Sequence, residues 1–210
     1  MSFHLPLQYA SLNSEQEYRL ALLRMVQARA ELMDGLRCAA SLGVQTWAIG
    51  AGVIRSLVWD ELHGFVVPTR MSDWDFVYYD PTVPMEHEAA LRARLAQCDR
   101  HVDRKWDVVN QAHVHHWLAR ENGSIFEAYA DLTQAIASWP ETATCVAVYL
   151  NQNQELEIIA PFGLRDLFEL KVRRNSHCLS PQAFAQRRVE KNWQDIWPQL
   201  QYVVDGASTT

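Results

Sequence analysis

The spacing of hydrophobic residues predicts a long helical stretch near the start of the chain. Over residues 14–42, apolar side chains recur every three or four positions, which is the period of one face of a helix. Ser14 and Glu17 stand three residues apart at the start of this stretch, as in a capping box. Asp34-Gly35 is the point at which the stretch would divide in two, if it divides.

Short apolar runs further along the chain predict strands. Residues 47–49 end at Gly50, and residues 73–79 and 105–109 are rich in aromatic and β-branched side chains. A helix is expected between the first two of these strands, with Gly64 as its stop signal.

The second half of the chain is predicted to combine a hairpin with helices. The apolar runs 144–150 and 155–160 flank a polar loop without glycine, so the hairpin is expected but its turn type is not specified. Helical spacing recurs over residues 124–137, 163–174 and 181–197.

The order of these elements favours an α/β or α+β fold around one sheet. The length of 210 residues is best interpreted as one domain, spanning residues 1–210. Its expected parts are an N-terminal helix at 14–42, a core at about 44–110, and a C-terminal hairpin with helices at 144–200.

Composition excludes several classes of protein. The net charge of −6 argues against tight, non-specific binding to a nucleic-acid backbone, although it allows a local basic pocket. The apolar runs are too short to span a bilayer, and no basic segment followed by an apolar run opens the chain, so we expect a cytoplasmic protein. The four cysteines are too widely spaced for a zinc site.

The first candidate for chemistry is the pair Asp73 and Asp75. Residues two apart in a strand point to the same face, so the two carboxylates would stand side by side and repel each other. A bound Mg²⁺ would remove the repulsion, whereas the alternative is a strand entry exposed to solvent. Asp107, a charged residue in an apolar strand, would either add a third carboxylate or lie on the surface of an edge strand.

The second candidate is the small-residue turn Gly50-Ala51-Gly52 between a predicted strand and a predicted helix. Small residues at such a turn let the backbone approach a phosphate, but they also occur in tight turns without a ligand. Arg55, one turn into the helix, could bind a phosphate, pair with Asp75 or lie in solvent.

These features together resemble the plan of the DNA polymerase beta-like nucleotidyltransferase superfamily, and more closely a bacterial branch of nucleotidyltransferase-like proteins. The resemblance covers roughly residues 40 to 200. It is carried by residues 47–55, 58–64, 73–80, 110–112, 139–144, 161–168 and 191–193, and by Trp197-Pro198.

The resemblance implies a nucleotidyltransferase-type mixed β-sheet flanked by helices. It also implies transfer of a nucleoside monophosphate from a nucleoside triphosphate to an acceptor, with release of pyrophosphate. The implied catalytic residues, which also hold Mg²⁺ (or Mn²⁺), are Asp73, Asp75 and Asp107. The implied phosphate-binding residues are Gly50, Ala51, Gly52 and Arg55.

Three positions depart from the family pattern. Ala51 replaces the usual serine of the turn, and Val109 and His113 stand where the branch commonly has basic residues. These departures favour an alternative, a non-catalytic nucleotide- or metal-binding relative that acts as a sensor or interaction protein, whereas the intact acidic set favours an enzyme. The acceptor is expected to be a protein, an RNA end or a small molecule, with no membrane partner and no bulk nucleic-acid binding.

Overall fold

A five-stranded mixed sheet lies at the centre of the computed structural model, with strand order β3-β2-β1-β4-β5. The structure describes residue 6 and residues 9–69, 73–101, 103–116, 127–178 and 181–203. The strands are β1 (Trp47–Gly50), β2 (Asp73–Tyr78), β3 (Lys105–Asn110), β4 (Ala147–Leu150) and β5 (Leu156–Ile159). Only β2 and β3 pair in parallel; the other neighbours in this sheet are antiparallel.

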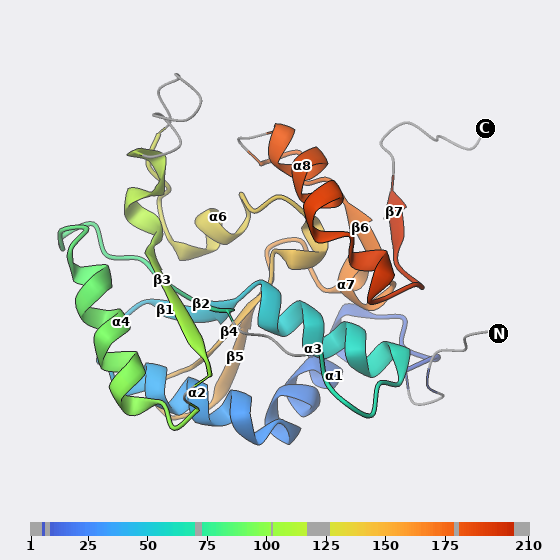
Figure 1. The fold of residues 1–210 in the computed structure, drawn as a ribbon, viewed down its shortest axis with the longest axis horizontal. Coiled ribbons are helices and arrows are strands. Elements are labelled where there is room, and N and C mark those ends of the chain that lie inside the picture. The colour runs from blue at the N-terminus through green and yellow to red at the C-terminus, as the bar shows by residue number, and fades with distance from the viewer. Residues whose placement is uncertain are drawn as a thin grey trace.

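Four helices cover one face of the sheet and enclose the main hydrophobic core. They are α1 (Glu15–Ala28), α2 (Ala30–Ala40), α3 (Gly52–His63) and α4 (His87–Cys98). The strands contribute alternate residues to this core, such as Trp74, Phe76 and Tyr78 of β2, because alternate side chains of a strand point to the same face. Figure 1 shows α1, α2 and α4 on one side of the sheet and α6 and α8 on the other.

The predicted break in the first helical stretch at Asp34-Gly35 is wrong, and so is the single N-terminal helix at 14–42. The capping box of Ser14 and Glu17 starts α1 as predicted, but the chain leaves the helix at Arg29, whose backbone is extended. Gly35 lies inside α2, where a β-carbon would come 2.8 Å from the ring of Trp74. That glycine therefore allows close packing of the helix on the sheet rather than ending the helix.

The described residues cover the opposite face of the sheet in part. The short helix α6 (Leu132–Ile136) packs a small apolar cluster against Ala48, Val77 and Ala147. The predicted helix over 124–137 is shorter than expected in its described part, because Asp131 caps the chain at that point and residues 127–131 are not helical. Residues 124–126 lie outside the described residues.

The C-terminal part returns to the core beside α3. A short helix α7 (Arg165–Phe168) is followed by the strand β6 (Lys171–Arg173), which pairs in parallel with β7 (Gln201–Val203). The predicted helix over 163–174 is therefore wrong beyond Phe168, since Leu170 takes a left-handed backbone with φ 56° and ends it. The helix α8 (Pro181–Lys191) also stops earlier than the predicted residue 197, at Asn192, whose φ is 37°.

The predicted hairpin is confirmed as β4 and β5, and Gly64 ends α3 in the left-handed conformation as predicted. In the part of the chain that the structure describes, no helix combines the length and the apolar character needed to cross a bilayer.

Candidate functional site

Three carboxylates line the open face of β2 and β3. Asp75 and Asp107 are direct partners in the parallel register of the two strands, and Asp73 lies two residues before Asp75 on β2. The intervening residues Trp74 and Trp106 are 5% and 6% exposed and pack into the core on the other face. The alternation of the two strands thus places all three acids on the side away from the core.

Asp75 is the half-buried member of this acidic group. Its Oδ2 accepts a long hydrogen bond of 3.4 Å from the backbone N–H of Gly52, at the start of α3. Burial raises the pKa of Asp75 and the neighbouring charge of Asp107 raises it further, against the lowering effect of the Gly52 hydrogen bond. The site therefore holds two facing carboxylates whose joint ionisation is unfavourable.

The described residues do little to neutralise these acids. Arg92 Nη2 lies 3.9 Å from Asp107 Oδ1, and both side chains are about half exposed, so the pair contributes little. Among the described residues, no side chain donates a hydrogen bond to Asp73 or forms an ion pair with it. No described group of three His, Cys, Asp or Glu side chains is arranged tightly enough to form a ready-made metal site.

The glycine-rich turn has a different local role from the one its sequence indicates. A β-carbon on Gly50 would come 2.6 Å from the ring of Trp139, so this glycine makes room for an indole rather than for a phosphate. The backbone N–H of Ala51 already donates to the carbonyl of Val146 at 3.0 Å. Ala51 also has φ 48° and ψ −108°, a backbone conformation that strains a residue with a β-carbon.

Arg55 is buried inside a cage of tryptophan rings. Its guanidinium carbon lies 4.4 Å from the ring centre of Trp193, 5.4 Å from that of Trp59 and 5.8 Å from that of Trp197. Only 7% of the residue is exposed, and its Nε has no hydrogen-bond partner among the described residues. Burial lowers the pKa of Arg55 to about 10, which still leaves the side chain charged near neutral pH.

Two alternatives for Arg55 are thereby excluded. It does not lie in solvent, and among the described residues it forms no hydrogen-bonded pair with Asp75, although the charge of Asp75 does stabilise it. The strongest favourable charge acting on Arg55 is that of Glu141, which is 1% exposed. Glu141 also accepts a hydrogen bond of 2.9 Å from Nε of Arg187, on α8. This buried carboxylate therefore binds Arg187 directly and favours the charge of Arg55 from a distance.

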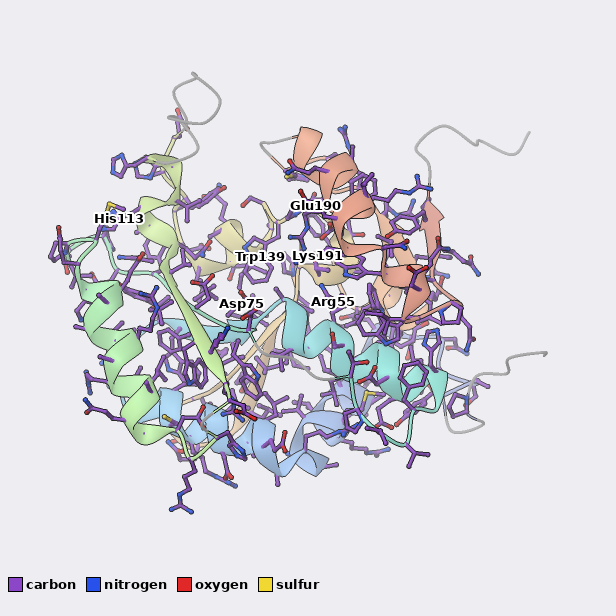
Figure 2. The ribbon with its side chains drawn as sticks, in the orientation of Figure 1. Arg55, Asp75, His113, Trp139, Glu190 and Lys191 are labelled. Atoms are coloured by element: carbon purple, nitrogen blue, oxygen red, sulfur yellow. The ribbon has the colours of Figure 1, made fainter. Side chains whose placement is uncertain are left out.

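A cleft with a volume of about 880 Å³ brings these elements together. It is bordered by the three acids, by Ala51 and Gly52 of the turn, and by residues of α8. Its described cationic side chains are Arg55, Arg92, Lys105, Arg187 and Lys191. Figure 2 shows Asp75, Arg55, Trp139 and Lys191 near the middle of the molecule, between the sheet and α8. Although the chain is acidic overall, the described cationic side chains of the cleft outnumber its three carboxylates.

Several residues singled out by sequence lie away from the cleft. His113 does not border it; its Nε2 lies 2.8 Å from the carbonyl of Val83, and Figure 2 shows it well apart from Asp75. Val109 does border the cleft. Of the two positions at which the branch commonly has a basic residue, 109 and 113, only position 109 therefore changes the charge of the cleft. Gly50 lies beneath Trp139 and does not line the cleft.

Sequence reasoning missed four residues of the cleft or its support: Gln111, Trp139, Glu141 and Arg187. Glu141 and Trp139 fall in a segment whose only sequence signal was its resemblance to a family block. Arg187 was visible only as one of several basic residues near the C-terminus, and nothing in its spacing distinguishes it from Lys171, which pairs with Glu169 instead. Only the folded chain shows which of these charges faces the acids.

Comparison with known proteins agrees with this architecture. A family model described as nucleotidyltransferase matches residues 37–202. The chain belongs to the nucleotidyltransferase family. The family resemblance stated from the sequence is confirmed, and so is the expected α+β class with a mixed sheet flanked by helices.

Solved structures place this nucleotidyltransferase-family chain among similar folds. One is an NMR structure described as revealing a CCA-adding enzyme head domain; it has 24% identity, a TM-score of 0.74, and coverage of 93% of this chain and 98% of that chain. A complex of a CCA-adding enzyme with CTP has 14% identity and a TM-score of 0.52 over 89% of this chain. This chain spans 43% of that enzyme. No protein with a curated function matches the sequence.

Proposed function

We propose that this chain is a metal-dependent nucleotidyltransferase, which moves a nucleoside monophosphate from a nucleoside triphosphate to an acceptor and releases pyrophosphate. One observation carries the proposal. Asp75 and Asp107 face each other in the same cleft as a buried, charged Arg55 whose Nε has no partner among the described residues. Adjacent sites for a cation and for an anion are what a metal–triphosphate complex requires.

The chemistry of the three acids fits a divalent cation. Carboxylate oxygens are the ligands that Mg²⁺ and Mn²⁺ prefer, and the paired charges of Asp75 and Asp107 lack a strong cationic partner among the described residues. A closed cage of protein ligands is not needed, because Mg²⁺ commonly binds through one or two carboxylates together with substrate phosphates and waters. When bound, the metal would neutralise charge on the transferring phosphoryl group.

The residues of the chain have separate roles in the proposed reaction. Arg55, Arg187 and Lys191 bind the β- and γ-phosphates, on the side of the cleft formed by α3 and α8. Asp73 and Asp75 would hold the metal beside the α-phosphate, and Asp107 accepts the proton from the acceptor. The acceptor oxygen or nitrogen forms a bond to the α-phosphorus as the bond to the bridging oxygen of pyrophosphate breaks. Positioning and electrostatics supply the rate enhancement.

A titration and a transfer assay test this proposal. Isothermal calorimetry with Mg²⁺ and a non-hydrolysable nucleoside triphosphate should show binding, and a labelled nucleotide should pass to protein, RNA or small-molecule acceptors. Asp75→Asn should lower transfer by roughly 100-fold or more. Asp34→Asn, an exposed acid on α2, is the matched control and should retain activity.

The same experiment addresses the non-catalytic alternative. The strained Ala51, whose amide is occupied by Val146, is the observation that favours a relative that binds nucleotide without transferring it. Binding of nucleotide without transfer to any acceptor class would support a sensor. Absence of binding to both nucleotide and inorganic tripolyphosphate would overturn both forms of the proposal.

A further inference from the structure

Gln111 is a buried polar side chain that the proposed reaction does not use. It is 5% exposed and borders the cleft, yet its side-chain amide makes no hydrogen bond to any described residue. Its neighbour Asn110 is the opposite case. The Asn110 side chain accepts from the backbone N–H of Asp80 at 3.1 Å and donates to the carbonyl of Asp80 at 2.7 Å. The Gln111 amide is not among the fully enclosed side-chain atoms that lack a partner, so it opens into the cleft, where it is free to bind a ligand.

The position of Gln111 in the cleft suggests which part of a ligand it meets. Asp107, Val109 and Gln111 follow one another at alternating positions and all border the cleft. At roughly 3.3 Å per residue, Gln111 lies about 13 Å along the chain from Asp107. This separation is close to the reach of a nucleoside from its α-phosphate to the far edge of its base. The cations Arg55, Arg187 and Lys191 belong to α3 and α8 rather than to β3, so they leave this part of the cleft for the nucleoside.

The walls around Gln111 suit a flat aromatic ring. Val114 and Tyr129 are each 8% exposed, border the cleft and form a small apolar cluster that Val109 packs against. An apolar wall with one amide at its end can enclose the faces of a base and read its edge.

We propose that Gln111 reads the edge of an adenine base at this end of the cleft, which makes ATP the preferred substrate of the proposed reaction. The amide carries a donor and an acceptor side by side. Adenine presents an amino group beside a ring nitrogen, which is the pair that a glutamine side chain contacts in a bidentate way. This inference rests on the proposed function, because it assigns the base of the same nucleotide.

Calorimetry on the full chain tests the assignment. The probes are non-hydrolysable analogues of ATP, GTP, CTP and UTP with Mg²⁺, and inorganic tripolyphosphate, which has no base. The wild-type chain should bind the ATP analogue about ten-fold or more tightly than the others, and Gln111→Leu should remove that preference. The affinity for tripolyphosphate should not change. Gln152→Leu, the same substitution in the exposed turn between β4 and β5, should alter nothing.

A stability measurement separates base reading from a structural role. Because the amide bonds to no described residue, Gln111→Leu should leave the melting temperature unchanged or raise it. A fall in melting temperature, equal binding of all four analogues, preference for another base, or a preference for ATP that survives Gln111→Leu would each overturn the inference. If tripolyphosphate binds while the bases are not distinguished, only this inference fails. If no probe binds, the proposed function fails with it.

Discussion

Asp75 and Asp107 occupy paired positions on the only parallel strand pair of the central sheet. Parallel register places their carboxylates on one face, and the pairing of Gly50 with Asp75 brings the start of α3 to the same point. Like charges directly opposite each other on neighbouring strands are destabilising. The fold thus maintains an unfavourable arrangement beside a helix N-terminus, which is characteristic of functional sites.

The strain at this acidic pair predicts that Asp75→Asn stabilises the protein at neutral pH. The pKa of Asp75 is raised from its ordinary value of 3.8, mainly by burial, so the protonated carboxyl favours the folded state. That contribution is fully present below about pH 4 and is lost as the pH rises through the raised pKa. Asn should therefore gain on the order of 1 kcal/mol at pH 7, as is common when a functional group is removed.

Urea unfolding of both chains from pH 3.5 to pH 8 measures this effect. The difference in free energy of unfolding between Asp75→Asn and the wild type should become smaller as the pH falls toward 4. A variant that is less stable than wild type at pH 7 would show that ionised Asp75 supports the fold, contrary to its environment.

Binding of a divalent metal should offset the loss of stability that ionised Asp75 causes in the wild-type chain. Mn²⁺ alone at millimolar concentration is expected to raise the melting temperature by several degrees, since a ligand that binds only the folded state stabilises it. The shift should be absent in Asp75→Asn and retained in Asp34→Asn, whose acid is exposed on α2. An equal shift in all three chains would mean that the metal binds elsewhere.

Replacing Arg55 by Met tests the anion site without emptying the tryptophan cage. Met is apolar and of similar length, so it can fill the space between Trp59 and Trp193 while removing a buried charge. The affinity for Mg²⁺-tripolyphosphate should fall about ten- to 100-fold, because a charge-assisted contact is lost. Stability should change little, since the Nε of Arg55 bonds to no described residue and Glu141 keeps Arg187 as a partner.

Arg19→Met provides the control for this substitution. Arg19 is an exposed residue of α1 paired with Glu15. Calorimetry should give this chain the wild-type affinity for tripolyphosphate. Unchanged affinity in Arg55→Met as well would remove Arg55 from the phosphate site.

The sequence predicts the strands of the site well and its surroundings poorly, for a physical reason. Asp73, Asp75 and Asp107 lie on strands whose period of two fixes which side chains share a face, and this period is readable from the chain. Gly50 shows the opposite case. Its small size could serve a phosphate or a neighbouring ring, and the neighbour, Trp139, is about ninety residues away in sequence.

The sequence also does not predict which charges face the acids, or the strand β7, because both depend on tertiary contacts. Whether Arg187 or Lys171 faces the acids depends on how α8 and β6 dock, which is a tertiary contact. The strand β7 is three residues long and exists only through its pairing with β6, so its local pattern is too short to predict it.

The contact between Gly50 and Trp139 predicts that Gly50→Ala is destabilising. A β-carbon 2.6 Å from the indole would displace the ring or the backbone of β1, at a cost of about 1–3 kcal/mol. Trp139→Leu, which removes the colliding ring, should reduce that cost in the double variant. Chemical denaturation of the wild type, both single variants and the double variant measures the coupling. Additive effects would show that the two residues do not restrain each other.

Ala51→Gly should stabilise the chain, and the sign follows from two opposing terms. The backbone at φ 48° and ψ −108° costs a residue with a β-carbon about 1–3 kcal/mol, and glycine removes that strain. Glycine also gives the unfolded chain more freedom, which costs about 0.4–1 kcal/mol. The difference favours glycine by roughly 1 kcal/mol.

Thermal unfolding of Ala51→Gly measures this gain in stability. The control is Ala40→Gly, at the end of the ordinary helix α2, which should lose stability. Because the amide of residue 51 keeps its bond to Val146 in either case, nucleotide affinity should stay at the wild-type value. A loss of stability in Ala51→Gly would mean that the turn is held in this conformation at no cost to alanine.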